Sequence, residues 1–285
     1  MTDNSIDSII KLLDDPDESV YSSISSRLIE DGLSVVKKLE ETWNTSDNPL
    51  IQKRIGEITQ QIQFRYVCKE MRLWKEVSGK SIIDGMYWIA RYQYHNYEKK
   101  SLYESLQPLV NDIKDELSDD FTPLEKINIV NHVLFQVHNF SRTLTGYNSP
   151  QHFFINNVLD TKKGNTYSLA LLYLSVARLC GIEVYGIDIP ENFALTFIDS
   201  KKSENPFHAD SVLFYINPSN KGAVFGKFEI DEYLRRLNIK REEKFFTPLT
   251  DIVTIKCTLK ALSAAYAKLG YNSKVEEINT LGGIL

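Results

Sequence analysis

Three cysteines, Cys68, Cys180 and Cys257, carry the side chains of this sequence that are best suited to covalent chemistry. Their number is odd and no two are closely spaced, which excludes a disulfide framework and a thiolate zinc site. Cys180 ends a strongly apolar segment, and the other two lie on amphipathic segments with no histidine nearby in sequence. We therefore expect all three to be inert packing residues.

The histidines offer few sites for metal or proton transfer. His132 and His138 are six positions apart on one expected helix, so they lie on different faces and do not form a ligand pair. His208 lies in a polar segment, where a general base would lack support. The Gly282-Gly283 pair has no helix after it to cradle a phosphate. We expect no metal and no other cofactor.

The composition and the net charge of the chain limit the class of protein and the kinds of partner that we expect. The chain has 285 residues, with 42% hydrophobic and 25% charged residues, which is typical of a soluble globular protein. The net charge of −5 repels phosphate backbones. The run Arg91–Lys100 interleaves aromatic and basic residues as RNA-binding surfaces do, but it lacks a known RNA-binding signature. We expect it to be a helix end that packs its tyrosines, and we expect no nucleic-acid partner.

The N-terminal sequence and the lengths of the apolar runs indicate where in the cell the protein is expected. No apolar run approaches the roughly 18 to 20 residues that cross a bilayer. The first ten residues, MTDNSIDSII, are acidic and have no basic segment, so no signal peptide is recognisable. These features predict a cytoplasmic protein that does not bind membranes.

Two similar acidic breaks organise the first part of the chain. Asp14–Glu18 and Asp47–Pro49 each precede apolar residues at helical spacing, and Pro16 and Pro49 are 33 positions apart. That period is close to the period of helical-hairpin repeats and predicts a HEAT-like array over residues 1–65. Two copies are too few to stand alone, so the array is expected to dock on the next part of the chain. An irregular helical subdomain with accidental similarity is the alternative.

The rest of the chain predicts helices, then a small sheet, then helices again. Thr122-Pro123-Leu124-Glu125 forms a capping box with proline at the first helical position, and the helix that it starts runs to Val137. Pro108 is expected to kink or bound another helix. Further helices are expected at 82–90, 102–113, 165–180 and 230–237. The strands of one mainly antiparallel sheet are expected at 183–189, 193–198 and 211–216. The segments 138–150 and 201–208 are expected to be loops, Gly222 and Gly226 to mark a turn, and residues 246–285 to form a tetratricopeptide-like helical hairpin.

One segment carries a family resemblance. Lys162 to Ala170, continuing to Gly181-Ile182, resembles the nucleophile helix of the transglutaminase-like superfamily and, more narrowly, its SirB-type core. The similarity extends upstream through 124–127 and 131–135, and downstream through 184–187 and 216–218. The resemblance implies an α+β fold of the papain-like cysteine-protease type. We place this core at residues 66–245, between the HEAT-like and hairpin regions.

The resemblance also implies where the catalytic residues of the superfamily would lie. Such enzymes use a cysteine at a helix N-terminus, a histidine on the next strand and an aspartate on the strand after it. These positions fall on Thr166, Asn192 and Asn217, so all three are substituted. A threonine hydroxyl has no useful anionic fraction at neutral pH, and an amide cannot accept a proton. The acyl-transfer mechanism of the family is therefore not available to these residues.

The sequence thus favours a non-catalytic, transglutaminase-like protein that binds a protein or peptide, with Thr166, Asn192 and Asn217 as a vestigial site. Three alternatives stay open. In the first, these positions have only local structural roles: Asn165 or Thr166 caps the helix, Asn192 opens a strand and Asn217 forms a turn. The protein is a residual hydrolase in which Thr166 is paired with a base such as His208. Or it is a structural subunit whose own side chains fill the cleft. The oligomeric state is left open.

Overall fold

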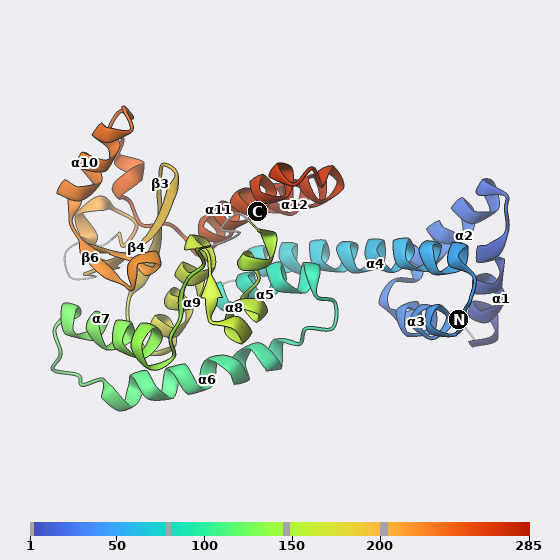
Figure 1. The fold of residues 1–285 in the computed structure, drawn as a ribbon, viewed down its shortest axis with the longest axis horizontal. Helices are drawn as coiled ribbons and strands as arrows, with labels where there is room; N and C mark the ends of the chain where they lie inside the picture. The colour runs from blue at the N-terminus through green and yellow to red at the C-terminus, as the bar shows by residue number, and fades with distance from the viewer. Residues whose placement is uncertain (1–2, 78–80, 145–148, 200–204) are drawn as a thin grey trace. The chain divides into compact units, whose positions relative to one another are not determined.

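The computed structural model describes residues 3–77, 81–144, 149–199 and 205–285, which form two compact units, Met1–Arg72 and Leu73–Leu285 (Figure 1). Each unit is described by itself. The architecture is mostly helical with a small antiparallel sheet, which confirms the expected α+β class. No helix in the described ranges is both long enough and apolar enough to cross a membrane.

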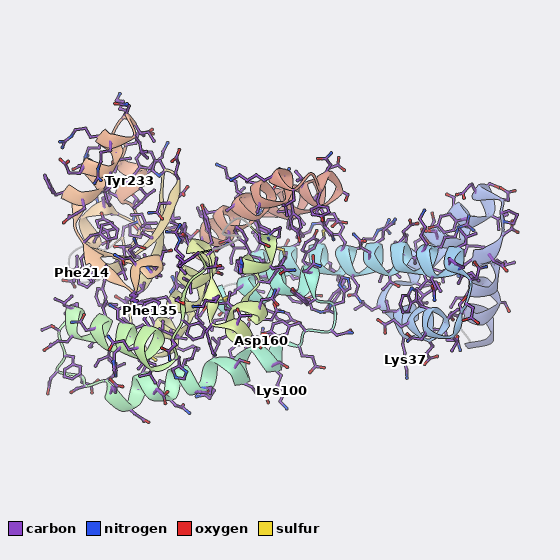
Figure 2. The ribbon with its side chains drawn as sticks, in the orientation of Figure 1. Lys37, Lys100, Phe135, Asp160, Phe214 and Tyr233 are labelled. Carbon is purple, nitrogen blue, oxygen red and sulfur yellow. The ribbon has the colours of Figure 1, made fainter. Side chains whose placement is uncertain are left out.

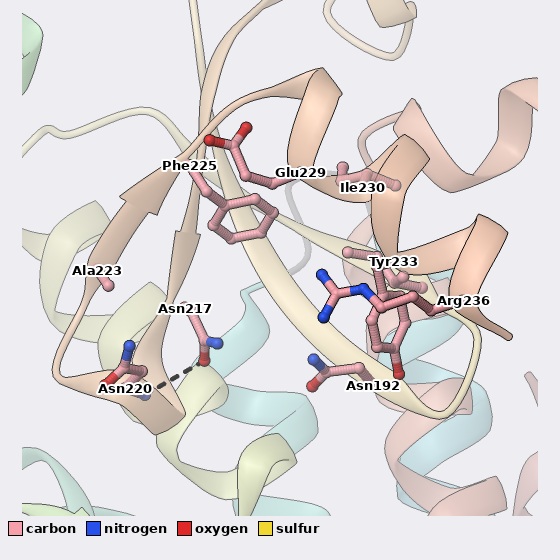
Figure 3. A pocket seen from close by; sticks show the side chains of 10 residues that line it. Asn192, Asn217, Asn220, Ala223, Phe225, Glu229, Ile230, Tyr233 and Arg236 are labelled. Carbon is pink, nitrogen blue, oxygen red and sulfur yellow. Dashed lines mark hydrogen bonds between the residues drawn. The ribbon is translucent and has the colours of Figure 1, made fainter.

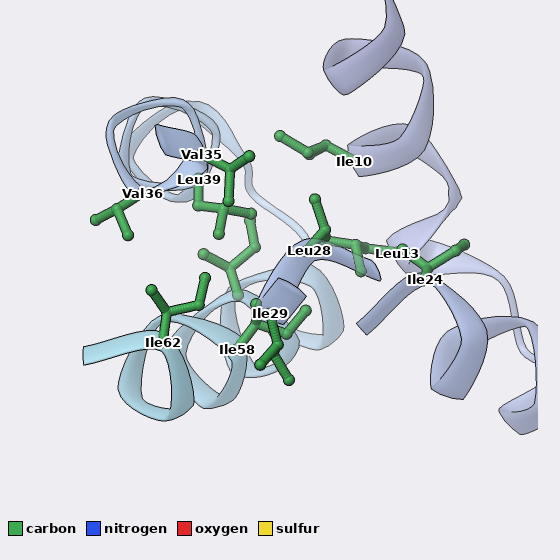
Figure 4. Close-up of a cluster of buried hydrophobic side chains, with 11 residues drawn as sticks. Ile10, Leu13, Ile24, Leu28, Ile29, Val35, Val36, Leu39, Ile58 and Ile62 are labelled. Carbon is green, nitrogen blue, oxygen red and sulfur yellow. The ribbon is translucent and has the colours of Figure 1, made fainter. Parts of the chain in front are cut away.

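Unit 1 is helical. Its helices are α1 (Asp3–Ile10), α2 (Glu18–Asp31), α3 (Val36–Thr45) and the first part of α4 (Pro49–Glu76), with short turns η1 (Lys11–Asp14) and η2 (Gly32–Val35). The Asp17 carboxylate caps α2 by accepting a hydrogen bond from the Ser19 amide at 2.8 Å, and Gly32 ends that helix with φ +67°. Isoleucine, leucine and valine side chains from all four helices and from both turns form one buried cluster (Figure 4).

The two proline-containing breaks of unit 1 precede helices of different length. The helix after Asp17, α2, has 14 residues, whereas the helix that begins at Pro49 has 28. On α3, Val36 and Leu39 are buried, whereas Trp43 is 45% exposed. Leu33 lies in the turn η2, before α3 begins, and is 43% exposed.

A buried arginine joins the turns of unit 1 to α4. The Arg54 side chain is 4% exposed, and its Nη1 donates to the carbonyls of Leu13 at 2.9 Å and Asp15 at 2.7 Å. Its Nη2 lies 2.8 Å from a Glu18 carboxylate that is mostly in solvent, and the guanidinium lies over the Tyr21 ring. The carbonyl contacts matter most, because buried carbonyls need donors whereas an exposed ion pair adds little.

Unit 2 contains the remaining helices. They are the end of α4, α5 (Ile82–Gln93), α6 (Lys99–Glu116), α7 (Pro123–Asn131), α8 (Ile155–Thr161), α9 (Thr166–Leu179), α10 (Lys227–Arg236), α11 (Asp251–Lys268) and α12 (Asn272–Ile284). Short 3₁₀ turns are η4 (Pro150–Phe153), η5 (Ala209–Ser211), η6 (Pro218–Asn220) and η7 (Glu243–Phe246). The capping box of Thr122 and Glu125 is present, and α7 continues to Val137 as a π-helical turn, η3 (His132–Val137). Pro108 does not bound α6, which runs through it.

The expected loop and tyrosine contacts are partly visible. Tyr92, near the end of α5, is buried and its hydroxyl donates to Glu277 on α12 at 2.5 Å, so this helix end does pack its tyrosines. The expected loop after His138 contains a two-residue strand, β1 (Ser141–Arg142), which pairs in parallel with β2 (Lys163–Gly164). Gly146 and residues 201–204 of the expected loops lie outside the described residues.

The main sheet has four antiparallel strands in the order β3 (Val184–Ile189), β4 (Asn192–Ile198), β5 (Val212–Asn217) and β6 (Ala223–Phe225). Three of them were expected. The fourth, β6, lies where we expected only a turn between glycines, and it pairs through Tyr215, Ile216 and Asn217 of β5. Strand β4 is buried along nearly its whole length, because α9 packs against it and its Ala194 side chain belongs to a second apolar cluster that includes side chains of α10.

Helix α9 is the central element of unit 2 (Figure 1). It packs against β3 and β4 and against α5, α6 and α8, and most of its side chains are buried. It stops as expected before Gly181, which has φ +75°. At that end Arg178 donates to both carboxylate oxygens of Asp251 on α11, at 2.5 and 2.7 Å, and to the Val184 carbonyl. Helix α9 is thus joined to β3 and α11 by hydrogen bonds as well as by apolar packing.

An amide of α7 holds the turn after β5. Asn131 donates through Nδ2 to the Gly222 carbonyl at 2.9 Å and accepts through Oδ1 from the Tyr173 hydroxyl at 2.9 Å. Burial raises the pKa of Tyr173 well above its ordinary value, so this hydroxyl stays protonated and donates. Phe135, labelled in Figure 2, stacks on the Tyr173 ring. Gly222 has φ +74°, and a Cβ there would lie 1.7 Å from Asn131 Oδ1.

Arg54→Leu is expected to lower the free energy of unfolding by about 2 to 4 kcal/mol, because two carbonyls would be left buried without a donor. Lys53→Leu is the control, since the Lys53 side chain is 73% exposed and its ammonium lies 3.9 Å from Glu57; it should change stability by less than about 0.5 kcal/mol. Urea unfolding followed by circular dichroism checks both variants. Equal effects would contradict the role given to Arg54.

Gly222→Ala separates close packing from backbone strain when it is compared with Gly270→Ala. Both glycines have positive φ, but nothing lies within 4 Å of a Cβ at Gly270. Gly270→Ala should cost about 1 to 2 kcal/mol from the left-handed backbone alone. Gly222→Ala should cost at least about 2 kcal/mol more, because the methyl group collides with Asn131. Thermal unfolding measures the difference, and equal costs would mean that the Asn131 contact does not fix this turn.

Candidate functional site

Thr166 is the first residue of α9 and is 3% exposed. Its Oγ1 accepts a hydrogen bond from the Ser219 hydroxyl at 3.0 Å. The helix cap is Asn165, whose Oδ1 accepts from the amides of Tyr167 and Ser168, both at 3.0 Å. Of the two caps that the sequence allowed, Asn165 is therefore the one used. Two amides at the helix N-terminus are satisfied by this cap, and they do not face an open site.

Asn192 and Asn217 lie at the ends of neighbouring strands. Asn192 begins β4 and accepts a hydrogen bond through Oδ1 from the Phe193 amide at 2.9 Å. Asn217 ends β5 and accepts through Oδ1 from the Asn220 amide at 3.2 Å, which starts the turn η6. The strand-opening and turn-forming roles are both visible in these hydrogen bonds. They occupy one acceptor of each side chain and leave the Nδ2 groups for other contacts.

A cleft of about 240 Å³ joins these two asparagines. It lies between the ends of β3 to β6 and one face of α10 (Figure 3). Its lining residues are Ile189, Asn192, Asn217, Asn220, Ala223, Phe225, Glu229, Ile230, Tyr233 and Arg236. Thr166 is not among them, and its link to this region is the hydrogen bond from Ser219 in η6. The cleft is thus open at two of the three family positions, and the third is enclosed.

His208, the base that the sequence offered as a partner of Thr166, has its contacts elsewhere. The ring of His208 accepts a hydrogen bond from the Asp210 amide, and its Nε2 lies 3.8 Å from a Glu243 carboxylate. The described contacts of the ring are with these groups and not with Thr166, and half of the side chain is in solvent. His208 therefore occupies a position at the surface, away from the threonine hydroxyl.

The cysteines are poor nucleophiles in this environment. Burial raises the pKa of Cys180 to about 11. Burial, and the Asp188 carboxylate with which its thiol interacts, raise the pKa of Cys257 to about 12. Cys68 is 6% exposed. None of the three cysteines forms a disulfide, and none lies at the family's cysteine position, which Thr166 occupies.

His132 and His138 each lie near a carboxylate. His138 lies 2.6 Å from the Asp112 carboxylate and His132 lies 3.8 Å from that of Glu116. Within the described residues no group of three or more histidine, cysteine, aspartate or glutamate side chains is arranged to hold a metal ion.

Of the residues that line the cleft, the sequence identified only Asn192 and Asn217 as site residues; Phe225, Tyr233 and Arg236 are among those that it missed. Tyr233 and Arg236 lie three positions apart on the expected helix at 230–237, and Glu229 lies one turn before Tyr233. Helical spacing alone therefore predicts that these side chains share one face of the helix. What the spacing could not show is that this face lies against the ends of β4 and β5. Phe225 lies on β6, the strand that was not expected.

Curated proteins match part of the chain in sequence. A 149-residue stretch is 29% identical to a "UPF0162 protein" of Xylella fastidiosa strain 9a5c and covers 52% of this chain and 49% of that protein. The same values hold for the "UPF0162 protein" of strain Temecula1. The chain therefore spans about half the length of the curated relatives that it matches. No solved structure matches it significantly.

The family assignment rests on a longer region. Residues 100–259, which include most of α6, all of α9, the four-stranded sheet and the first half of α11, match the transglutaminase-like superfamily. This region is more than half of the chain and contains all three substituted positions. The chain belongs to the transglutaminase-like superfamily.

Proposed function

We propose that this protein binds a peptide segment of a partner in the cleft beside α10 and does not catalyse acyl transfer. The supporting observation is the state of the three family positions. Thr166 is buried with its hydroxyl accepting from Ser219, while Asn192 and Asn217 line an open cleft with amides that cannot accept a proton. Nucleophile and base are lost, and the concave surface remains.

A hydrolase that uses Thr166 is the competing proposal. It needs a base that hydrogen-bonds to the threonine hydroxyl, or that moves to it when substrate binds. The contacts of His208 with Asp210 and Glu243 disfavour this role, and so does the enclosure of Thr166. We therefore prefer binding, and activity assays serve as the direct test.

We also propose the finer organisation that the sequence suggests. It consists of a HEAT-like region at 1–65, a SirB-type core at 66–245 and a TPR-like tail at 246–285, in a cytoplasmic protein. The spacing of the prolines supports the first region, and the packing of α11 on α12 supports a hairpin in the last. Free cysteines support a reducing compartment.

Alkylation of the thiols tests the loss of cysteine chemistry. Because the pKa values of Cys180 and Cys257 are raised, the thiolate fraction at pH 8 is lower by roughly a hundredfold and a thousandfold, respectively, than at the ordinary pKa. Iodoacetamide should modify both cysteines at least about tenfold more slowly in the folded than in the urea-unfolded protein, and faster as pH rises. Peptide mass spectrometry measures the rates. If a cysteine were modified as fast in the folded as in the unfolded protein, its thiol would be reactive in the fold, which would contradict the proposal.

A cleft-filling substitution tests the binding proposal. Ala223 lines the cleft, whereas its neighbour Val224 does not, because successive side chains of a strand point to opposite faces. A soluble library of random pentapeptides with free carboxyl ends is passed over immobilised protein, and retained peptides are identified by mass spectrometry. Binding should persist in Val224→Trp and fall at least about tenfold in Ala223→Trp, since the indole would occupy the cleft.

The same peptides serve as substrates. Wild-type protein and Thr166→Ala should leave them unchanged, with no hydrolysis and no crosslinking to an added amine. Turnover that disappears in Thr166→Ala would support the hydrolase instead. Retention of no peptide, or equal retention by Ala223→Trp and Val224→Trp, would overturn the cleft as the binding site.

A further inference from the structure

We infer that the cleft recognises a carboxylate of its peptide ligand, held by Arg236 and by the amide groups of Asn192 and Asn217. This inference rests on the proposed binding function and adds the chemical class of the ligand. The carboxylate belongs either to the C-terminus of a peptide or to an aspartate or glutamate side chain.

The orientation of both asparagine amides is fixed by hydrogen bonds. Asn192 Oδ1 accepts from the Phe193 amide and Asn217 Oδ1 accepts from the Asn220 amide. Only the oxygen of a side-chain amide can accept from an N–H. Each Oδ1 therefore faces the backbone amide that donates to it, and each Nδ2 group points away from that amide. In Figure 3 the Asn217 nitrogen points to the centre of the cleft. The two family positions therefore present hydrogen-bond donors, and both donors are without a partner among the described residues.

Arg236 adds a positive charge to the same part of the cleft. Figure 3 shows its guanidinium extending from α10 into the space between Asn192, Asn217 and Phe225. The neighbouring Arg235 pairs with Glu232 at 2.6 Å, but within the described residues Arg236 has no acidic partner. Arg236 lies in the last turn of α10, where the helix dipole favours a cation. That position does not by itself direct the Arg236 side chain into the cleft. Five N–H donors on a planar group suit a carboxylate.

The acidic group of the cleft faces its other end. Glu229 accepts a hydrogen bond from the Gly226 amide at 2.9 Å, where it caps α10. In Figure 3 its carboxylate points away from Arg236, beyond the Phe225 ring. Glu191, next to Asn192, does not line the cleft, and the Tyr233 hydroxyl donates to the Pro190 carbonyl at 3.1 Å. On the side of the cleft that holds Arg236, the guanidinium is therefore the charged group among the lining side chains.

The substitutions at the family positions have a consequence for charge. An aspartate at position 217 would place a carboxylate beside Arg236, neutralise the guanidinium and repel an anionic ligand. Asparagine removes that charge and keeps a donor, so the cleft favours an anion, whereas a catalytic aspartate at this position would disfavour one. The volume of about 240 Å³ is below the roughly 300 to 1,000 Å³ of drug-sized sites. One or two residues fit, with an apolar side chain against Phe225 and Ile230.

Small blocked amino acids test this inference on the full chain. The probes are N-acetyl-leucine, N-acetyl-leucinamide and N-acetyl-leucyl-glutamyl-amide, which carry a terminal carboxylate, no carboxylate and a side-chain carboxylate, respectively. Arg236→Gln removes the charge, and Arg235→Gln is the matched control from the same helical turn. Chemical-shift changes in the ¹⁵N spectrum of the protein give the dissociation constants.

At least one carboxylate probe should bind about tenfold or more tightly than N-acetyl-leucinamide, and that preference should disappear in Arg236→Gln and persist in Arg235→Gln. The terminal and side-chain probes show which source of carboxylate is preferred. If pentapeptides bind the cleft but acid and amide probes bind alike, or if Arg236→Gln has no effect, the carboxylate inference is overturned while the binding function stands. If no peptide binds at all, both are overturned.

Discussion

The candidate site depends on one partly buried contact, between the Asn131 side chain and the backbone at Gly222. The amide of Asn131 accepts from Tyr173 on α9 and donates to the Gly222 carbonyl, so one side chain joins α7, α9 and the turn after β5. That turn begins at Asn217, and the strand after it, β6, carries Phe225. The cleft keeps its shape because this turn cannot move away from α9, and only a residue without a Cβ permits so close an approach.

Local signals predicted much of this fold, and long-range contacts account for what they missed. The capping box at Thr122 and the glycine that ends α9 act within a few residues, so the sequence alone places these helix ends. Strand β6 has three residues and forms only because β5 offers a free edge, so its own sequence carries little signal. The place of Arg236 within the cleft likewise depends on how α10 packs, which periodicity cannot give.

In the function that we propose, the fold has outlasted the chemistry of the family. A cysteine, a histidine and an aspartate act as a unit, and loss of the nucleophile and the base removes nearly all of the rate that they provide. The scaffold that held them, an apolar helix against an antiparallel sheet, is stabilised by packing and by the Arg178–Asp251 pair, none of which needs the catalytic groups. In our proposal Asn192 and Asn217 serve as donors beside a cation, and the same concave surface selects a ligand by charge.

Binding without turnover can be observed in one sample. In protein labelled with ¹⁵N on asparagine, the side-chain amide resonances of Asn192 and Asn217 are followed while a retained pentapeptide is added, and the peptide spectrum is recorded over a day. Our account predicts that both amide resonances shift with a common dissociation constant and that the peptide stays intact. Cleavage or crosslinking of the peptide at a rate that depends on Thr166, or asparagine resonances that do not respond to bound peptide, would contradict it.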